Sequence, residues 1–291
     1  MQKEEYKLFK NIVQAAAYGD AIGLPYLSTP RGTFNCKGIC KCFDDSIYKV
    51  PAGTWSDKAS LLMCSYDAIR YSSEDFDPVT LNPRRLNKDM LTEKLQENIK
   101  SWRENGKYSP VQPPFRIDEY MIAYYNDIKK NSIHGDFLIL LTPLAFLGLS
   151  KEELLNYIII IAGDMYNAPD NIVAGLFYVK FLTELIKGIG CHTAYLNVLY
   201  DFDKRLEIPA MGLIWEKKIQ NCKPSMIPED VSGISALYTS LWSLMNTVDL
   251  ENAIYRAVEM GGESSLNGAL TAIMGFAIYR KFKLQEIIKL K

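Results

Sequence analysis

A short turn near the carboxyl end of this chain combines one carboxylate and two hydroxyls with two glycines, in the order Gly261-Gly262-Glu263-Ser264-Ser265. Apolar residues recur with helical spacing on both sides, so the glycines end one helix and a serine begins the next. Oxygen-bearing side chains at the positive end of a helix could bind a metal ion or a phosphate. Capping of the second helix by Ser264 or Ser265 is the commoner role of such a turn.

The two helices that flank this turn determine how it is held. Residues 249–260 carry apolar side chains on one face, the pattern of an amphipathic helix. Residues 264–279 are apolar on nearly every side, which is typical of a buried helix. Gly268 and Gly275 share one face of that helix, where a second helix could approach closely. The turn is therefore expected at the start of a buried helix.

Two earlier stretches place Asp20 and Asp57 among small residues: Gly19-Asp-Ala-Ile-Gly-Leu-Pro25 and Gly53-Thr-Trp-Ser-Asp-Lys-Ala-Ser-Leu62. With the turn at 261–265 they resemble the three motifs of the ADP-ribosylglycohydrolases. Those motifs read Gly-Asp-Ala-Leu-Gly-x-Pro, Gly-x-Trp-(Ser/Thr)-Asp-Asp-Thr-Ser-Leu and Gly-Gly-Asp-Thr-Asp-Thr. The three stretches occur in the same order and at similar spacing across almost the whole chain. The chain is therefore identified, by resemblance, as a divergent member of that family.

The resemblance implies an all-α fold, a compact orthogonal bundle of helices with a central cleft. In the family, two acidic motifs hold a pair of Mg²⁺ ions, and the cleft binds ADP-ribose and hydrolyses its glycosidic link to a target. Mg²⁺ requires near-octahedral oxygen ligands, so carboxylates from the turns of two helices supply both geometry and charge. Hydrolysis also needs an activated water and stabilisation of a positively charged ribosyl transition state.

The resemblance assigns roles to positions of the central motif and of the C-terminal turn. The implied ligand-binding residues are Ser56, Asp57, Lys58, Gly261, Gly262, Glu263, Ser264 and Ser265. The implied catalytic residues are Asp57, Glu263 and Asp20. A surviving metal site would use Ser56, Asp57, Glu263 and Ser265.

Several of these positions depart from the family pattern. Lys58 stands where the family has the second aspartate of its central motif. Glu263 replaces the first aspartate of the C-terminal motif, while Ser265 and Leu266 replace its second aspartate and final threonine. Leu27 falls where many members place an acidic residue. The middle of the chain differs as well.

In that middle region the run His134-Gly-Asp-Phe-Leu-Ile-Leu140 stands where the family commonly has Gly-Asn-Gly-Ser-Leu-Met-Arg. Tyr166 lies about where a histidine is expected. Two carboxylates, Asp57 and Glu263, together with the Lys58 ammonium carry a net charge of −1, where the family has four carboxylates for two divalent cations. We therefore expect no cofactor, and Mg²⁺ only if a residual site survives.

Lys58 itself is expected to occupy the vacated metal position, with its ammonium bridging Asp57, Glu263 or both. Two acidic side chains in a buried cleft would otherwise repel each other, and a lysine supplies three donors to their oxygens. The alternative is that Lys58 points to solvent, as most lysines do.

Three functional hypotheses follow. The first is a catalytically degenerate relative that binds ADP-ribose or ADP-ribosylated targets. The second is a residual or altered hydrolase that removes ADP-ribose from protein or small-molecule acceptors. The third is a structural or partner-binding module whose cleft is closed by Leu27, Leu266 and Phe137.

Composition narrows the classes of partner. The chain has 33 Lys and Arg against 34 Asp and Glu, so its net charge of −1 favours neither nucleic acid nor an anionic membrane as a partner. No signal peptide is evident, and the longest apolar run, 137–149, is too short to span a bilayer. A cytoplasmic protein with free thiols at its 6 cysteines is expected. The sequence does not indicate whether the protein is a monomer or an oligomer.

The hydrophobic periodicity predicts one all-α domain over residues 1–291, a bundle of about ten helices. No segment shows the alternation of a strand, and no linker is long enough to divide the chain. The expected helices are 4–18, 56–71, 87–102, 117–130, 137–149, 150–163, 169–187, 192–204, 230–245, 249–260 and 264–279.

Overall fold

A computed structural model of the chain describes residues 3–41, 48–73, 86–115 and 132–280. Within these ranges the fold is all-α and contains no strands, as predicted; two isolated bridges join Ser73 to Leu86 and His134 to Ser232. The helices are α1 Lys3–Gly23, α2 Asp57–Tyr71, α3 Lys88–Asn105, α5 Asp136–Leu141, α6 Lys151–Ala162, α7 Pro169–Ile186, α8 Cys191–Asp201, α9 Gly212–Trp215, α10 Gly233–Met245, α11 Leu250–Val258 and α12 Ser264–Tyr279.

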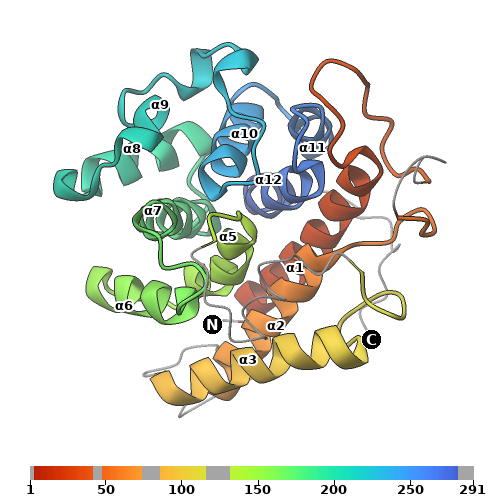
Figure 1. The fold of residues 1–291 in the computed structure, drawn as a ribbon. Helices are drawn as coiled ribbons and strands as arrows, with labels where there is room; N and C mark the ends of the chain where they lie inside the picture. Colours follow the sequence, from red (N-terminus) through yellow and green to blue (C-terminus); the bar gives the residue numbers. More distant parts are fainter. Residues whose placement is uncertain (1–2, 42–47, 74–85, 116–131, 281–291) are drawn as a thin grey trace.

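Helix α12 runs through the middle of the bundle, between α1 and the pair α10 and α11 (Figure 1). Its side chains are buried over almost its entire length, as its apolar sequence predicts. The close approach expected at its glycines is confirmed. A Cβ placed on Gly268 would lie 2.3 Å from the carbonyl oxygen of Gly19 in α1, and one on Gly275 would lie 2.6 Å from Cδ1 of Leu250. The absence of side chains on glycine therefore permits backbone contact between α1 and α12.

Local capping signals define several helix ends. Asn87 accepts hydrogen bonds from the backbone N–H groups of Asp89 and Met90 and begins α3. Ser150 and Glu153 form a capping box at the start of α6. Helix α11 ends at Val258, two residues before the expected end at 260, and Gly261 and Gly262, with left-handed φ of 77° and 63°, form the turn to α12.

Other boundaries differ from the sequence-based expectations. Helix α1 continues through Gly19 and Asp20 to Gly23, five residues beyond the expected end at 18. The helix expected over 137–149 is divided into α5 and a 3-10 helix over Thr142–Phe146, because Pro143 has no N–H to continue the α-helical pattern. The helix expected over 117–130 lies outside the described residues.

Two further findings concern the described residues as a set. None of their helices is long and apolar enough to cross a membrane. Their cysteines, Cys36, Cys40, Cys64, Cys191 and Cys222, form no disulfides.

Candidate functional site

The first part of the site joins α1 to the start of α2. The Asp20 carboxylate, fully buried in α1, accepts hydrogen bonds from the backbone N–H of Ser56 at 2.9 Å and from its hydroxyl at 2.7 Å. The same hydroxyl oxygen lies 2.8 Å from Oδ1 of Asp57. Ser56 precedes α2 as expected but makes no side-chain capping bond, because its hydroxyl is directed to the two carboxyl groups instead.

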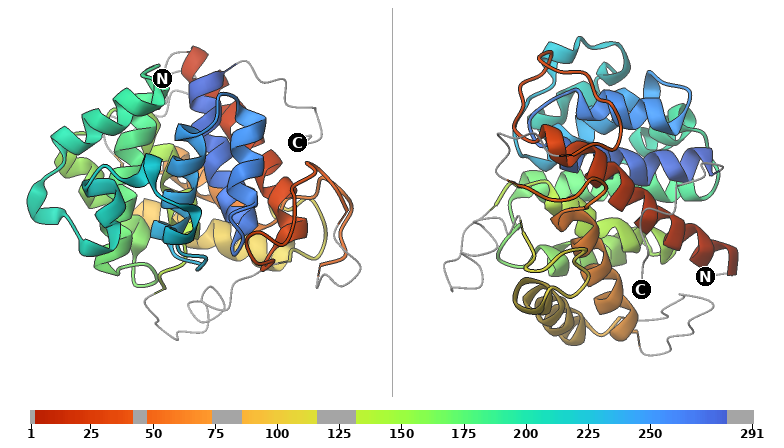
Figure 2. Two further views of the ribbon diagram at one scale, coloured as in Figure 1. Left: turned by 90° about the horizontal axis from the view of Figure 1, so that it is seen from above. Right: turned by 90° about the vertical axis from the view of Figure 1, so that its right-hand side faces the viewer.

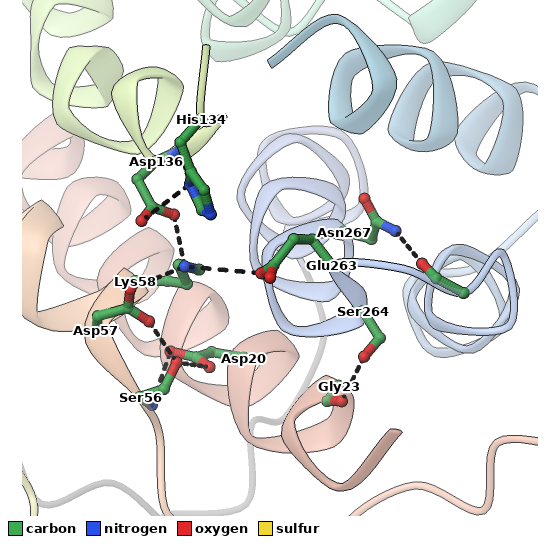
Figure 3. Close-up of polar contacts among 11 residues, drawn as sticks. Asp20, Gly23, Ser56, Asp57, Lys58, His134, Asp136, Glu263, Ser264 and Asn267 are labelled. Atoms are coloured by element: carbon green, nitrogen blue, oxygen red, sulfur yellow. Dashed lines mark hydrogen bonds and ion pairs between the residues drawn. The ribbon is translucent and has the colours of Figure 1, made fainter. Parts of the chain in front are cut away.

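The second part of the site is the Lys58 ammonium, which is entirely buried. Its Nζ lies 2.8 Å from Oδ2 of Asp57, 2.5 Å from Oδ1 of Asp136 and 3.9 Å from Oε2 of Glu263 (Figure 3). The prediction that Lys58 points inward, to Asp57 and Glu263, is confirmed. The first contact is a charge-assisted hydrogen bond, and the other two are ion pairs.

Asp136 is the member of this cluster that sequence reasoning missed. It is the first residue of α5 and has no exposed surface. The available signal was a carboxylate two residues after a histidine, directly before the apolar run 137–141. An acidic residue at the start of a helix that is otherwise apolar requires a buried partner, which here is Lys58.

His134 lies beside Asp136, with its Nδ1 3.2 Å from Oδ2 of that carboxylate. Burial opposes a charge on either group, but their mutual attraction outweighs it and shifts both pKa values. The pKa of His134 is raised above its ordinary 6.5 by the Asp136 charge and hydrogen bond. The pKa of Asp136 is held well below its ordinary 3.8 by the charges of His134 and Lys58.

These two shifts predict a specific dependence of stability on pH. The His134 contribution is complete below its unfolded pKa of 6.5 and is lost as pH rises through the higher folded value. The Asp136 contribution is complete above its unfolded pKa of 3.8 and is lost as pH falls through the lower folded value. The combined contribution should therefore be greatest between about pH 4 and 6.5 and should decline on the alkaline side.

Urea unfolding of His134→Gln at pH 5.5 and 8.5 tests this dependence. The variant should be less stable than the parent protein at pH 5.5, and the difference should be smaller at pH 8.5. His192→Gln, at an exposed position of α8, is the control and should follow the parent protein at both values. An equal loss of stability for His134→Gln at the two pH values would contradict the prediction.

The serines of the C-terminal turn have a different role from the one expected. The residue that precedes α12 is Glu263, so Ser264 and Ser265 are helical and neither caps the helix. The Ser264 hydroxyl donates to the carbonyl oxygen of Gly23 at 2.8 Å and so attaches α12 to the end of α1. Ser265 is fully buried in the first turn of α12. Within this turn, only Glu263 is among the carboxylates around Lys58.

The family profile described as ADP-ribosylglycohydrolase matches residues 1–278. The chain belongs to the ADP-ribosylglycohydrolase family. A solved structure named "ADP-ribosylglycohydrolase-related protein complex" has a similar fold, with a TM-score of 0.65 and 20% sequence identity over 96% of this chain and 88% of that chain. No curated protein sequence matches the chain.

A small cavity opens beside the Lys58 cluster of this ADP-ribosylglycohydrolase-family protein. Its volume is about 270 Å³, and Glu263 is the carboxylate of the cluster that lines it, with 11% of its side chain exposed. The cavity also has a second carboxylate and two hydroxyl side chains. The lining residues are Ser28, Thr29, Pro30, Glu229, Val231, Gly262 and Glu263.

The outer wall of this cavity belongs to the loop that follows α1. The Arg31 guanidinium donates to the carbonyl oxygens of Met260 at 3.0 Å, Ile227 at 2.9 Å and Pro224, which anchors the loop. The loop packs on Gly261, where a Cβ would lie 2.7 Å from the Arg31 nitrogen. Of the two glycines expected beside a ligand, Gly262 lines the cavity and Gly261 lies beneath the loop.

Of the three residues expected to close the cleft, Leu266 and Phe137 lie in the core, and Leu27 is half-buried; none of them lines the cavity. Leu266 is fully buried against Gly135, the residue between His134 and Asp136, and a Cβ on that glycine would lie 2.5 Å from Cδ2 of the leucine. Phe137 stacks on Tyr166 with 5.3 Å between the ring centroids. Leu266 and Phe137 therefore support the main chain that presents His134 and Asp136, and they are not among the residues that line the cavity.

Proposed function

We propose that this member of the ADP-ribosylglycohydrolase family has lost metal-dependent hydrolysis and binds ADP-ribose or ADP-ribosylated protein. The observation that carries the proposal is the buried Lys58 ammonium among the carboxylates of Asp57, Asp136 and Glu263. A covalently attached cation provides the charge neutralisation that the family obtains from Mg²⁺.

The residues at this position do not fit a magnesium pair. Mg²⁺ requires six oxygen ligands at about 2.0–2.1 Å in near-octahedral geometry. Here Asp57 and Asp136 are already ion-paired with one ammonium, and a divalent cation a few Å from that ammonium would be repelled by several kcal/mol. No group of three or more His, Cys, Asp and Glu side chains in the described parts of the chain is arranged to hold a metal ion.

The cavity supports retention of ligand binding. Carboxylate and hydroxyl side chains are suitable acceptors and donors for the hydroxyl groups of a ribose, and Glu263, Ser28 and Thr29 supply them. The loop over Gly261 is anchored by Arg31, so this wall is formed before a ligand arrives. The open cavity also argues against a module whose cleft is closed.

Calorimetric titration with ADP-ribose tests the proposal. We expect saturable binding with the same affinity in EDTA and in millimolar Mg²⁺, and no turnover of ADP-ribosyl-arginine, ADP-ribosyl-serine or O-acetyl-ADP-ribose. Glu263→Gln should weaken binding, since it changes the carboxylate that lines the cavity, whereas the surface change Glu216→Gln should not. Failure to bind ADP-ribose would reject the binding function, and Mg²⁺-dependent turnover of about 1 per second or faster would reject the loss of hydrolysis.

A second candidate function, metal-independent hydrolysis, is favoured by one specific observation. The His134 imidazole is paired with the Asp136 carboxylate, whose charge could orient it as a general base. Turnover of any of the three substrates in EDTA, abolished by His134→Gln and by Asp57→Ala, would establish this function in place of the first.

A further inference from the structure

Helices α6, α7 and α8 lie on the opposite side of the bundle from the loop after α1 (Figures 1 and 2). A second cavity is lined by residues of these three helices. Its volume is about 270 Å³. Three lysines and two carboxylates line it, so the cavity carries a net positive charge although the whole chain is at −1. The lining residues are Leu149, Lys151, Leu154, Lys180, Thr183, Glu184, Lys187, Asn197, Val198 and Asp201.

Two of these lysines converge from different helices on one carboxylate. Lys180 of α7 lies 2.6 Å from Oδ2 of Asp201, and Lys151 of α6 pairs with Oδ1 of the same group. Each ammonium also lies 3.4 Å from the main-chain carbonyl oxygen of Asp201. Lys180 is held within the fold, with 14% of its side chain exposed and its Nζ 5.7 Å from the centre of the Phe202 ring.

Asp201 occupies an electrostatically unfavourable place. It is the last residue of α8, where the helix dipole places partial negative charge, so a carboxylate there is repelled by its own helix. Its attraction to Lys151 and Lys180 compensates that repulsion. Half of the Asp201 side chain is exposed, so the carboxylate can turn away when another anion takes its place.

We propose that this cavity binds a small phosphate monoester, with Asp201 acting as the internal anion that the phosphate displaces. A phosphate dianion carries more charge than one carboxylate and can engage Lys151, Lys180 and Lys187 together. Lys187 pairs with Glu184 at 2.8 Å on the surface, an exchangeable contact. The apolar side chains of Leu149, Leu154 and Val198 provide a floor for the organic part of the ligand.

Titration with phenyl phosphate at constant ionic strength tests this site, because the probe has one phosphate and an apolar ring. The decisive variant is Asp201→Asn, which removes the competing anion and should tighten binding several-fold. Lys180→Met, which keeps the aliphatic stem over Phe202, should weaken binding about tenfold or more. If Lys180→Met does not fold, Lys151→Met is the substitute, because its side chain is 68% exposed, and it should also weaken the binding of phenyl phosphate.

Higher affinity in Asp201→Asn together with lower affinity in Lys180→Met would distinguish a binding site from a purely structural contact. If the lysines serve only to neutralise the end of α8, Asp201→Asn will not create or improve affinity for phenyl phosphate, and that result overturns the proposal. Equal binding of benzoate would overturn the preference for phosphate. Glu263→Gln should leave phenyl phosphate binding unchanged, so the outcome is independent of the function proposed for the Lys58 cluster.

Discussion

Replacement of Lys58 by alanine should lower the free energy of unfolding by about 3 kcal/mol or more, measured by urea unfolding at pH 7. The change leaves the carboxylates of Asp57 and Asp136 buried without the ammonium that both contact within 2.8 Å. Removal of one partner of a buried ion pair leaves the other charge uncompensated, and the fold must then expose or protonate it. Lys58→Met should show a similar loss, because the volume is kept and the charge is not.

A surface ion pair provides the matched control. Lys218 lies 2.6 Å from Glu216 with 63% of its side chain exposed, so Lys218→Met should change stability by less than about 0.5 kcal/mol. A Lys58→Ala variant as stable as the parent protein would contradict the proposed role of the Lys58 ammonium.

Replacement of Gly268 by alanine should have a comparable effect, a loss of about 3 kcal/mol, because it separates α1 from α12. A Cβ at this position would lie 2.3 Å from the carbonyl oxygen of Gly19. The opposing group is backbone and cannot rotate away as a side chain would. The displacement would also move Asp20, which follows Gly19 and holds Ser56, so ADP-ribose affinity should fall together with stability.

Gly212→Ala is the control for the Gly268 prediction. Gly212 also has helical backbone geometry, with φ of −53°, and no atom lies within 4 Å of a Cβ placed on it. Alanine should be neutral there or should stabilise the protein by up to about 1 kcal/mol, through the unfolded state. A Gly268→Ala variant that unfolds at the same urea concentration as the Gly212→Ala variant would show that α1 and α12 can separate without cost.

Much of the fold was predictable from local sequence, because local interactions determine those features. The left-handed backbone that only glycine adopts readily places the turn at Gly261 and Gly262, and the Ser150 and Glu153 side chains define the start of α6. The apolar surface of 264–279 on all sides required a buried helix. The inward direction of Lys58 was predicted through the family resemblance, which assigned Asp57 and Glu263 to one cleft, and the alternative of a solvent-facing Lys58 was excluded only by the structure.

Other features depended on contacts between segments that are distant in the chain. Asp136 contacts Lys58 because α5 packs beside α2. The helical periodicity of each segment predicts its own buried face and does not predict which other helix that face contacts. A serine directly before a helix commonly caps it, but the Ser56 hydroxyl donates to Asp20, 36 residues earlier. A helix end at Gly19 was a reasonable local prediction. The tertiary structure keeps that glycine helical, because the backbone of α12 fills the space where a side chain would stand.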